Sequence, residues 1–310
     1  MPKPIASLPG VRRSAVAAAI TLVTVIAAWG CSESSDTSST PDIVYEANDS
    51  GVVNVYRVSP KTGLTTQLTS GSRNSNPAWS PGKQSIVFVS DRENGQVDIY
   101  VMAADGTDAV RLTDTPAREI APKFSPGGDR IAFARDDGSE WSLWLMNADG
   151  TEARKVAGPY RFVEFPSWRP DRNEIFYSAI DPGGGPADIF RIDLDTGEVS
   201  VAISTPSSDV CPHFSHDGNW LTYATDAGDA GEIDVFRHDL ESSATDGAGD
   251  LRLTDTPGTD DYANYSPDDT QLVFVTRRDG ESELFLMNED GSEQRPLTQT
   301  PGLQENVPDW

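Results

Sequence analysis

Cysteine and histidine are scarce in this chain of 310 residues. The two cysteines are Cys31 and Cys211, and the three histidines are His213, His216 and His238. So few thiols and imidazoles argue against a disulfide scaffold and against a zinc site built from several such ligands.

Basic residues are also in short supply. The chain has 24 lysines and arginines against 49 aspartates and glutamates, which gives a formal net charge of −25. Such a surface repels phosphate backbones, so we expect no nucleic-acid partner. The 26 glycines and 22 prolines predict many short elements joined by turns rather than an all-helical bundle.

The one long apolar run, Ala15 to Ala28, falls short of the ~20 residues needed to span a bilayer comfortably. Lys3, Arg12 and Arg13 precede it, and no acidic residue occurs before Glu33. This arrangement is typical of an export signal, so we expect residues 1–30 to be a signal peptide.

The end of this segment, "AAWGC", resembles a bacterial lipoprotein signal, in which a small residue precedes a cysteine that receives lipid. The resemblance implies lipidation at Cys31, attachment to the cell envelope, and with Ser32 next, sorting to the outer membrane. An ordinary cleaved signal or an uncleaved anchor is the alternative. Residues 31–41 are polar and predict a flexible tether. If Cys31 is lipidated, Cys211 has no partner and is expected to be a buried small residue.

A six-residue phrase returns throughout the rest of the chain. It is written "NPAWSP", "APKFSP", "FPSWRP", "CPHFSH" and "YANYSP", and "ENVPDW" begins it again. Its aromatic recurs at intervals of 44 to 51 residues, at Trp79, Phe124, Trp168, Phe214, Tyr265 and Trp310. A period of roughly 40–50 residues made of short strands indicates propeller blades.

Each repeat divides into four predicted strands. The opening phrase marks the first strand. The second strand contains an apolar-x-aromatic triplet, for example Ile86 and Phe88 with one residue between them, and the third strand has its own aromatic, for example Tyr100. A turn such as Asp105-Gly106 follows, and a strand around Leu112 closes the unit. Alternation places both residues of the triplet on one face, against the neighbouring blade.

The two ends of the repeat region complement each other. The first unit begins at Ile43 and lacks an opening phrase, while residues 305–310 supply one without the rest. We therefore predict an all-β domain at 42–310, a six-bladed β-propeller of four-stranded antiparallel blades. The C-terminal strand joins the N-terminal blade, which removes two exposed sheet edges.

The set "NPAWSP", "IVFVSDR", "DIYVMAADG" and "RLT" resembles the TolB-type, WD-like propeller repeat from Asp42 to Trp310. The resemblance implies the propeller fold. It leaves function open, because such blades occur in periplasmic scaffolds, carbohydrate-handling proteins and gating domains of peptidases. TolB also carries an α/β domain before its propeller, and none is expected here.

No catalytic motif is present. A G-x-S-x-G elbow and a phosphate-binding glycine loop are both missing, and no peptidase-sized region remains beside the blades. Ser80, Ser125, Ser215 and Ser266 recur at one blade position, so we expect them to bond turn backbone. "CPHFSH", from Cys211 to His216, has metal-ligand types, but a local variation of the repeat is the preferred interpretation. "DLDTG", at 193–197, has calcium-like spacing, yet a hairpin turn is expected there.

Carboxylates recur where the innermost strands begin. Three residues before each opening proline, or its equivalent Ala263, stand Asn74, Glu119, Val163, Asp209, Asp260 and Glu305, and Glu164 and Asp261 lie one position further on. We predict that Glu119, Glu164, Asp209, Asp260, Asp261 and Glu305 surround one mouth of the central channel. They would favour a cation such as calcium, an amine or a basic peptide. General acidity, as in a protein of saline habitats, is the competing explanation.

The sequence therefore predicts a non-catalytic, extracytoplasmic binding scaffold, anchored by lipid and recognising a protein or peptide, with no cofactor and no metal. One alternative is a carbohydrate-binding or carbohydrate-cleaving propeller, for which Arg73, Arg118, Lys123 and His213 would be the cations at the mouth. The other is a Tol-like scaffold of the cell envelope.

Overall fold

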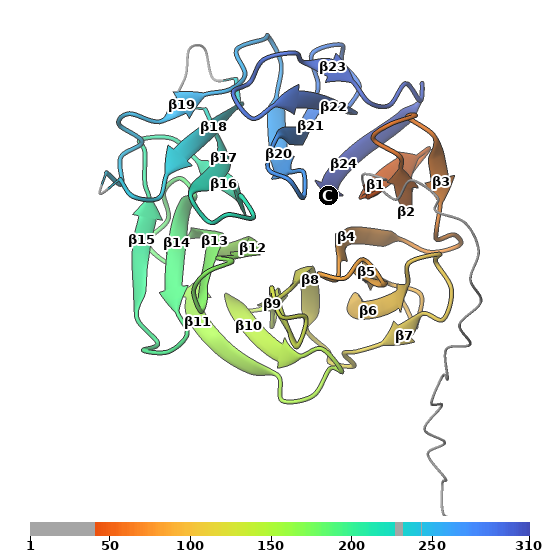
Figure 1. The fold of residues 1–310 in the computed structure, drawn as a ribbon. Coiled ribbons are helices and arrows are strands. Elements are labelled where there is room, and N and C mark those ends of the chain that lie inside the picture. The colour runs from red at the N-terminus through yellow and green to blue at the C-terminus, as the bar shows by residue number, and fades with distance from the viewer. Residues whose placement is uncertain (1–40, 227–231, 243) are drawn as a thin grey trace, which may run out of the picture. The chain divides into compact units, whose positions relative to one another are not determined.

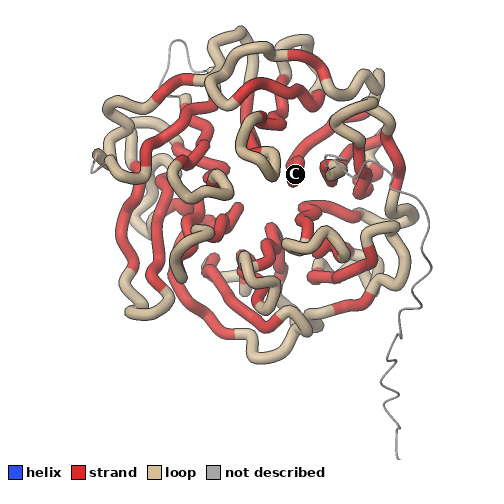
Figure 2. The backbone as a smooth tube through the Cα atoms, viewed as in Figure 1, coloured by secondary structure: helices blue, strands red, loops and turns tan. Residues whose placement is uncertain are grey.

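In the computed structural model, residues 41–226, 232–242 and 244–310 are described. The predicted signal peptide, Cys31 and all but the last residue of the predicted tether lie outside them. Within these ranges the protein contains 24 β-strands and no α-helix (Figure 2). Accordingly, no helix in the described part of the chain could cross a bilayer.

Six four-stranded antiparallel sheets stand around a central axis (Figure 1). Numbered from the N-terminus and ordered from the axis outwards, the first three blades are β24 (Leu303–Asp309), β1 (Ile43–Asp49), β2 (Val52–Val58) and β3 (Thr65–Gln67); β4 (Asn74–Trp79), β5 (Ser85–Ser90), β6 (Asp98–Ala103) and β7 (Val110–Arg111); and β8 (Arg118–Phe124), β9 (Arg130–Asp136), β10 (Trp141–Asn147) and β11 (Arg154–Tyr160).

The other three blades repeat this order. They are β12 (Phe162–Trp168), β13 (Glu174–Ile180), β14 (Asp188–Asp193) and β15 (Val199–Ile203); β16 (Asp209–Phe214), β17 (Trp220–Thr225), β18 (Asp234–Asp239) and β19 (Leu251–Arg252); and β20 (Asp260–Tyr265), β21 (Gln271–Thr276), β22 (Glu283–Asn288) and β23 (Arg295–Pro296). The prediction of six four-stranded blades is confirmed.

The first blade is assembled from both ends of the repeat region, as predicted. Strand β24 pairs antiparallel with β1, from Val44 opposite Asp309 to Asp49 opposite Leu303. The Trp310 side chain is buried, and its indole nitrogen donates to the Pro41 carbonyl at 3.1 Å. The ring is thus closed by main-chain pairing and by packing of the terminal aromatic.

The aromatics of the second and third strands face each other directly in every blade. The six cross-strand pairs are Tyr45–Tyr56, Phe88–Tyr100, Phe133–Trp144, Tyr177–Phe190, Tyr223–Phe236 and Phe274–Phe285. Their ring centroids are 5.6–6.4 Å apart. Such pairs contribute roughly 0.2–1 kcal/mol each beyond what alanine would provide, and they fix the register.

An apolar cluster fills each of the six interfaces between blades. At the first interface, Ile86 and Phe88 of β5 pack with Val44 and Val55 of the preceding blade. The last cluster joins the sixth blade to the first and includes Trp310. Glycine at the β6–β7 turn permits a close approach, since a Cβ on Gly106 would lie 2.6 Å from the Leu68 carbonyl oxygen. Each blade therefore holds its neighbours rigidly.

Candidate functional site: the two mouths of the central channel

Each inner strand carries a β-bulge at the same position. The backbone there takes a positive φ of 48–56° at residues that are not glycine, and the pairing with the next strand shifts register. The residues are Asn76, Ala121, Phe165, Cys211, Tyr262 and Val307. Proline follows in five of the six blades, which accounts for the proline in the repeated phrase. Bulges re-aim the side chains that follow them.

The bulges divide the channel into two halves. Four of the bulge residues, Asn76, Ala121, Phe165 and Val307, line a narrow cavity of about 30 Å³ at the waist. Residues before the bulges surround a cavity of about 380 Å³, which we call the upstream mouth. Residues after the bulges surround one of about 260 Å³, the downstream mouth.

Four of the six predicted site carboxylates do not face the channel. Glu119, Asp209, Asp260 and Glu305 are fully buried, and each accepts a hydrogen bond from a threonine hydroxyl four or five residues earlier. Glu119 also pairs with Arg135 at 2.7 Å. The expected ring of six carboxylates is therefore wrong, because these side chains turn back to brace the connection between blades.

The remaining two carboxylates, Glu164 and Asp261, do belong to the upstream half. Glu164 lines the upstream mouth, and Asp261 pairs with Arg277 at 3.0 Å. Burial raises the pKa of Glu164 to about 7, with a further contribution from the Asp261 charge that Arg118 opposes. Burial likewise raises the pKa of Asp261 to about 6. Arg73 and Arg118 also line this mouth, so its charge is mixed rather than uniformly acidic.

Replacing Glu164 by glutamine is expected to stabilise the protein most at alkaline pH. Because the folded-state pKa lies above the ordinary value of 4.5, the stability that protonated Glu164 contributes is lost as the pH rises through about 7. A glutamine side chain cannot ionise, so the melting temperature of Glu164→Gln should exceed that of the wild type by a few degrees at pH 8 and by less at pH 5. Glu289→Gln, at a surface carboxylate, is the control, and equal gains at both pH values would contradict the assignment.

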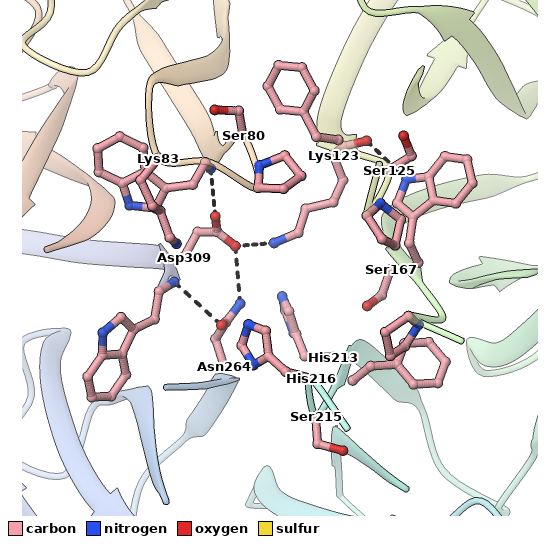
Figure 3. Close-up of a pocket in the computed structure, with 18 residues that line it drawn as sticks. Ser80, Lys83, Lys123, Ser125, Ser167, His213, Ser215, His216, Asn264 and Asp309 are labelled. Atoms are coloured by element: carbon pink, nitrogen blue, oxygen red, sulfur yellow. Dashed lines mark hydrogen bonds and ion pairs between the residues drawn. The ribbon is translucent and has the colours of Figure 1, made fainter. Parts of the chain in front are cut away.

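The downstream mouth is organised around Asp309 on β24 (Figure 3). This buried carboxylate accepts the Trp79 amide at 2.7 Å and the Asn264 side-chain amide at 3.2 Å, and it forms an ion pair with Lys123. Lys83 is near enough to help hold the pKa of Asp309 below its usual value, against the opposite effect of burial. The Asp309 carboxylate therefore interacts with residues of β4, β8 and β20 and of the turn that follows β4.

Lys83 and two histidines, His213 and His216, complete this mouth. Burial, reinforced by the charge of Lys123, lowers the pKa of His213 to about 4, so its ring is neutral at pH 7. Burial also lowers the pKa of Lys83 to about 8. His216 stands at the rim, where its Nδ1 is 2.9 Å from Asp269.

The residues of "CPHFSH" do not converge on a metal ion. Cys211 is buried at the bulge, with its thiol pKa raised by burial, and its amide donates to Ser178. His213 and His216 have separate partners, the Cys211 carbonyl and Asp269. Within the described ranges, no three His, Cys, Asp or Glu residues form a metal-binding group.

Two interpretations of recurring turn residues are confirmed. The hydroxyls of Ser80, Ser125, Ser215 and Ser266 each accept the backbone amide five residues later, at 3.0–3.1 Å. In "DLDTG", Asp193 accepts the amides of Asp195 and Thr196 in the hairpin between β14 and β15. These side chains stabilise the turns by hydrogen bonds to the backbone.

Sequence reasoning named Lys123 and His213 as mouth cations, and the structure places both downstream, whereas Arg73 and Arg118 lie upstream. It missed Lys83, Asn264 and Asp309. The sequence does distinguish Lys83 from its equivalents in the other repeats. The turns after the other opening phrases have glycine, aspartate or arginine at this position, so the lysine is peculiar to one blade.

The chain is similar in sequence and in fold to known proteins. A family model described as the TolB beta propeller domain matches residues 34–180 and 139–310. The protein TolB homolog of Chlorobium luteolum is 29% identical over 272 residues, which cover 87% of this chain and 59% of that protein. The uncharacterized peptidase YuxL of Bacillus subtilis is 29% identical over 185 residues, covering 58% of this chain and 26% of that protein.

The crystal structure of TolB from Acinetobacter baumannii superimposes with a TM-score of 0.74 at 18% identity, covering 87% of this chain and 66% of that one. At this identity the likeness concerns the fold. The chain spans about a quarter of the length of YuxL and about three fifths of the length of the Chlorobium luteolum protein.

Proposed function

Since this chain belongs to the TolB beta-propeller family, we propose that it is a non-catalytic binding platform of the cell envelope that holds a protein or peptide at its downstream mouth. The observation that carries the proposal is the downstream cavity of about 260 Å³. Its walls combine five aromatic side chains and three prolines with ten polar residues, so a ligand can find both apolar contacts and hydrogen-bond partners there.

The walls of the cavity are preorganised. Trp79, Phe124, Trp168 and Trp310 are each at most 9% exposed. They stand at the ends of inner strands or just beyond, and the apolar clusters between blades hold those strands. A rigid site loses little conformational entropy when a ligand binds, which favours affinity.

A binding role without catalysis fits the hydrogen bonding of the reactive side chains. The recurring serine hydroxyls hold turns, and the only hydrogen bonds of histidine rings in the described ranges go to Asp269, Asp250 and the Cys211 carbonyl. No histidine there is paired with a serine or cysteine side chain as an activated nucleophile requires.

Cell-envelope attachment rests on the proposed lipidation of Cys31. Cells that produce the protein and are fed an alkyne analogue of palmitate should yield a labelled 310-residue product or its cleaved form, and Cys31→Ser should abolish the label. Cys211→Ser is the matched control and should keep it, since Cys211 lies buried in the propeller. Label that persists in Cys31→Ser would refute lipidation at this residue.

The binding platform can be tested by site-specific photo-crosslinking in cells that make the protein naturally. A benzophenone amino acid at Pro81, an exposed residue of the downstream rim, should capture a discrete protein partner. The same group at Lys61, in the exposed β2–β3 turn, is the control. Equal capture from both positions, or from neither, would contradict the proposal.

The upstream mouth is a second candidate, for a cation or a basic group, because Glu46, Asp91 and Glu164 line it. Arg73 and Arg118 line the same cavity and offset part of this negative charge. Calorimetric titration with calcium chloride should give heat that Glu164→Gln removes if this mouth binds calcium, and identical traces would refute calcium binding there.

A further inference from the structure

The downstream mouth is a cationic site in a strongly acidic protein. Lys83 and Lys123 contribute two ammonium groups, and Asp309 is the one carboxylate among the residues that line the cavity. His213 is neutral at pH 7, so the side chains that line the cavity include two ammonium groups against one carboxylate. The whole chain carries −25, which makes a local positive site of this kind unexpected from composition.

Asp309 does not cancel both lysines. Its pairing is with Lys123, while it also accepts the Trp79 amide and the Asn264 side chain. Lys83 has no ion pair closer than 4 Å among the described residues, and its ammonium lies 5.5 Å from the Trp79 ring centroid. The Lys83 ammonium is half-buried and interacts with Asp309 only at a distance, without a direct ion pair, so it is available to a ligand anion.

The surroundings of the cavity restrict what kind of anion can enter. The loops that follow the inner strands carry exposed aspartates, namely Asp129, Asp171, Asp217 and Asp268. Their neighbours Pro126, Pro170 and His216 line the downstream cavity, so three of the four stand on the loops of its rim. Ion pairs with Arg130, Arg169 and Arg172 partly offset Asp129 and Asp171, so the rim gives a ligand with many negative charges, such as a polyuronate or a nucleic acid, little net attraction.

The depth of the site restricts the ligand further. The channel narrows to about 30 Å³ immediately behind Lys123, His213 and Asp309, at the waist that the bulges form. Aromatic and proline side chains make up eight of the 18 residues that line the downstream mouth. A cavity that narrows behind two ammonium groups and offers aromatic side chains beside them suits a single negative group at the tip of a chain.

We propose that the downstream mouth binds the terminal carboxylate of a peptide or protein whose preceding residues are neutral or basic. This rests on the proposed function and specifies its ligand. The carboxylate accepts hydrogen bonds from Lys83 and Lys123, the last side chain packs on the tryptophan wall, and basic residues before it meet the aspartate rim. Charge-assisted hydrogen bonds of this kind are short and strong.

The test uses the full propeller and a random heptapeptide library displayed with free C-termini. Peptides selected on the immobilised protein are then synthesised both as acids and as C-terminal amides, and affinities are measured by calorimetry. We expect the amide to bind about tenfold more weakly or worse, as loss of a charge-assisted contact implies. Lys83→Met should cause a similar loss, and Lys61→Met, at an exposed lysine elsewhere, should cause none.

The outcomes separate this inference from the proposed function. Lys83→Met leaves the Lys123–Asp309 pair intact, and its circular dichroism must match the wild type. Selected peptides whose affinity is unchanged by amidation would overturn the carboxylate inference and leave peptide binding standing. A library that yields no binder would overturn both. Trigalacturonate or inorganic phosphate binding more tightly than the best peptide acid would assign the site to a sugar acid or to phosphate, which also overturns the inference.

Discussion

Deleting residues 305–310 is expected to lower the melting temperature by more than about 5 °C and to promote oligomers or aggregates. The deletion removes most of β24, which is the inner strand of the first blade. The edge of β1 then loses its main-chain partner, and the cluster between the sixth and first blades loses Trp310. Unpaired strand edges are templates for association between chains.

The measurements are differential scanning calorimetry and size-exclusion chromatography with light scattering. A synthetic peptide of residues 303–310, added in excess, should restore part of the melting temperature because it can pair with β1 in place of β24. A peptide of the same composition in scrambled order is the control. An unchanged melting curve with a monomeric profile would contradict closure of the ring by this strand.

Asp309→Asn is expected to be the most destabilising single substitution at the downstream mouth, by roughly 3 kcal/mol at pH 7, the order of loss when one partner of a buried ion pair is removed. Burial alone would raise the pKa of Asp309, but Lys123 and Lys83 outweigh it and hold the pKa below 3.8. The carboxylate therefore stabilises the fold above about pH 4, and this contribution is lost as the pH falls through the lowered pKa.

Thermal melts between pH 3 and pH 8 check this expectation. The difference in melting temperature between wild type and Asp309→Asn should be largest at neutral pH and should shrink on acidification. Adding Lys123→Met should restore part of the loss, since the lysine then no longer lacks its partner. The control is Asp42→Asn, because Asp42 and Arg57 form a surface pair at 3.7 Å that contributes little. A gap that is independent of pH would argue against an ionised Asp309.

The fold could be predicted from the sequence because its signals are local and repeated. The spacing of Phe88 and Tyr100, and of their counterparts, puts two aromatics opposite each other on adjacent strands, so the second and third strands are marked in every blade. The split first blade was predictable for the same reason, since a missing strand at one end and a surplus strand at the other are complementary.

The functional side chains were harder to place because the decisive backbone feature leaves little trace in the sequence. The bulge residues include Ala121, Phe165 and Val307, none of which is glycine, although φ is positive at each. Glycine would have marked the position, as it does in the hairpin turns. Their place at the start of the inner strands assigned Glu119 and Glu305 to the channel mouth, whereas both side chains are fully buried against the connections between blades.

The threonines that donate hydrogen bonds to these carboxylates could have indicated from the sequence that the carboxylates are buried. Thr115 and Thr300 each precede a buried carboxylate by four or five residues, and the segments "TDTP" and "TQTP" repeat around them. A carboxylate with a hydroxyl partner so near in sequence is better placed to stabilise a turn than to receive a ligand. Burial of the acidic group follows from that pairing.

Strand β1 pairs with β24, so the earliest and latest strands of the propeller are immediate neighbours. A ribosome releases β1 long before β24 has been made. While the propeller is being synthesised, then, five blades can acquire all four strands as they emerge, and the first blade must wait with an unpaired edge on β1. Ring closure follows the synthesis of β24, so the first blade to begin is the last one to be completed.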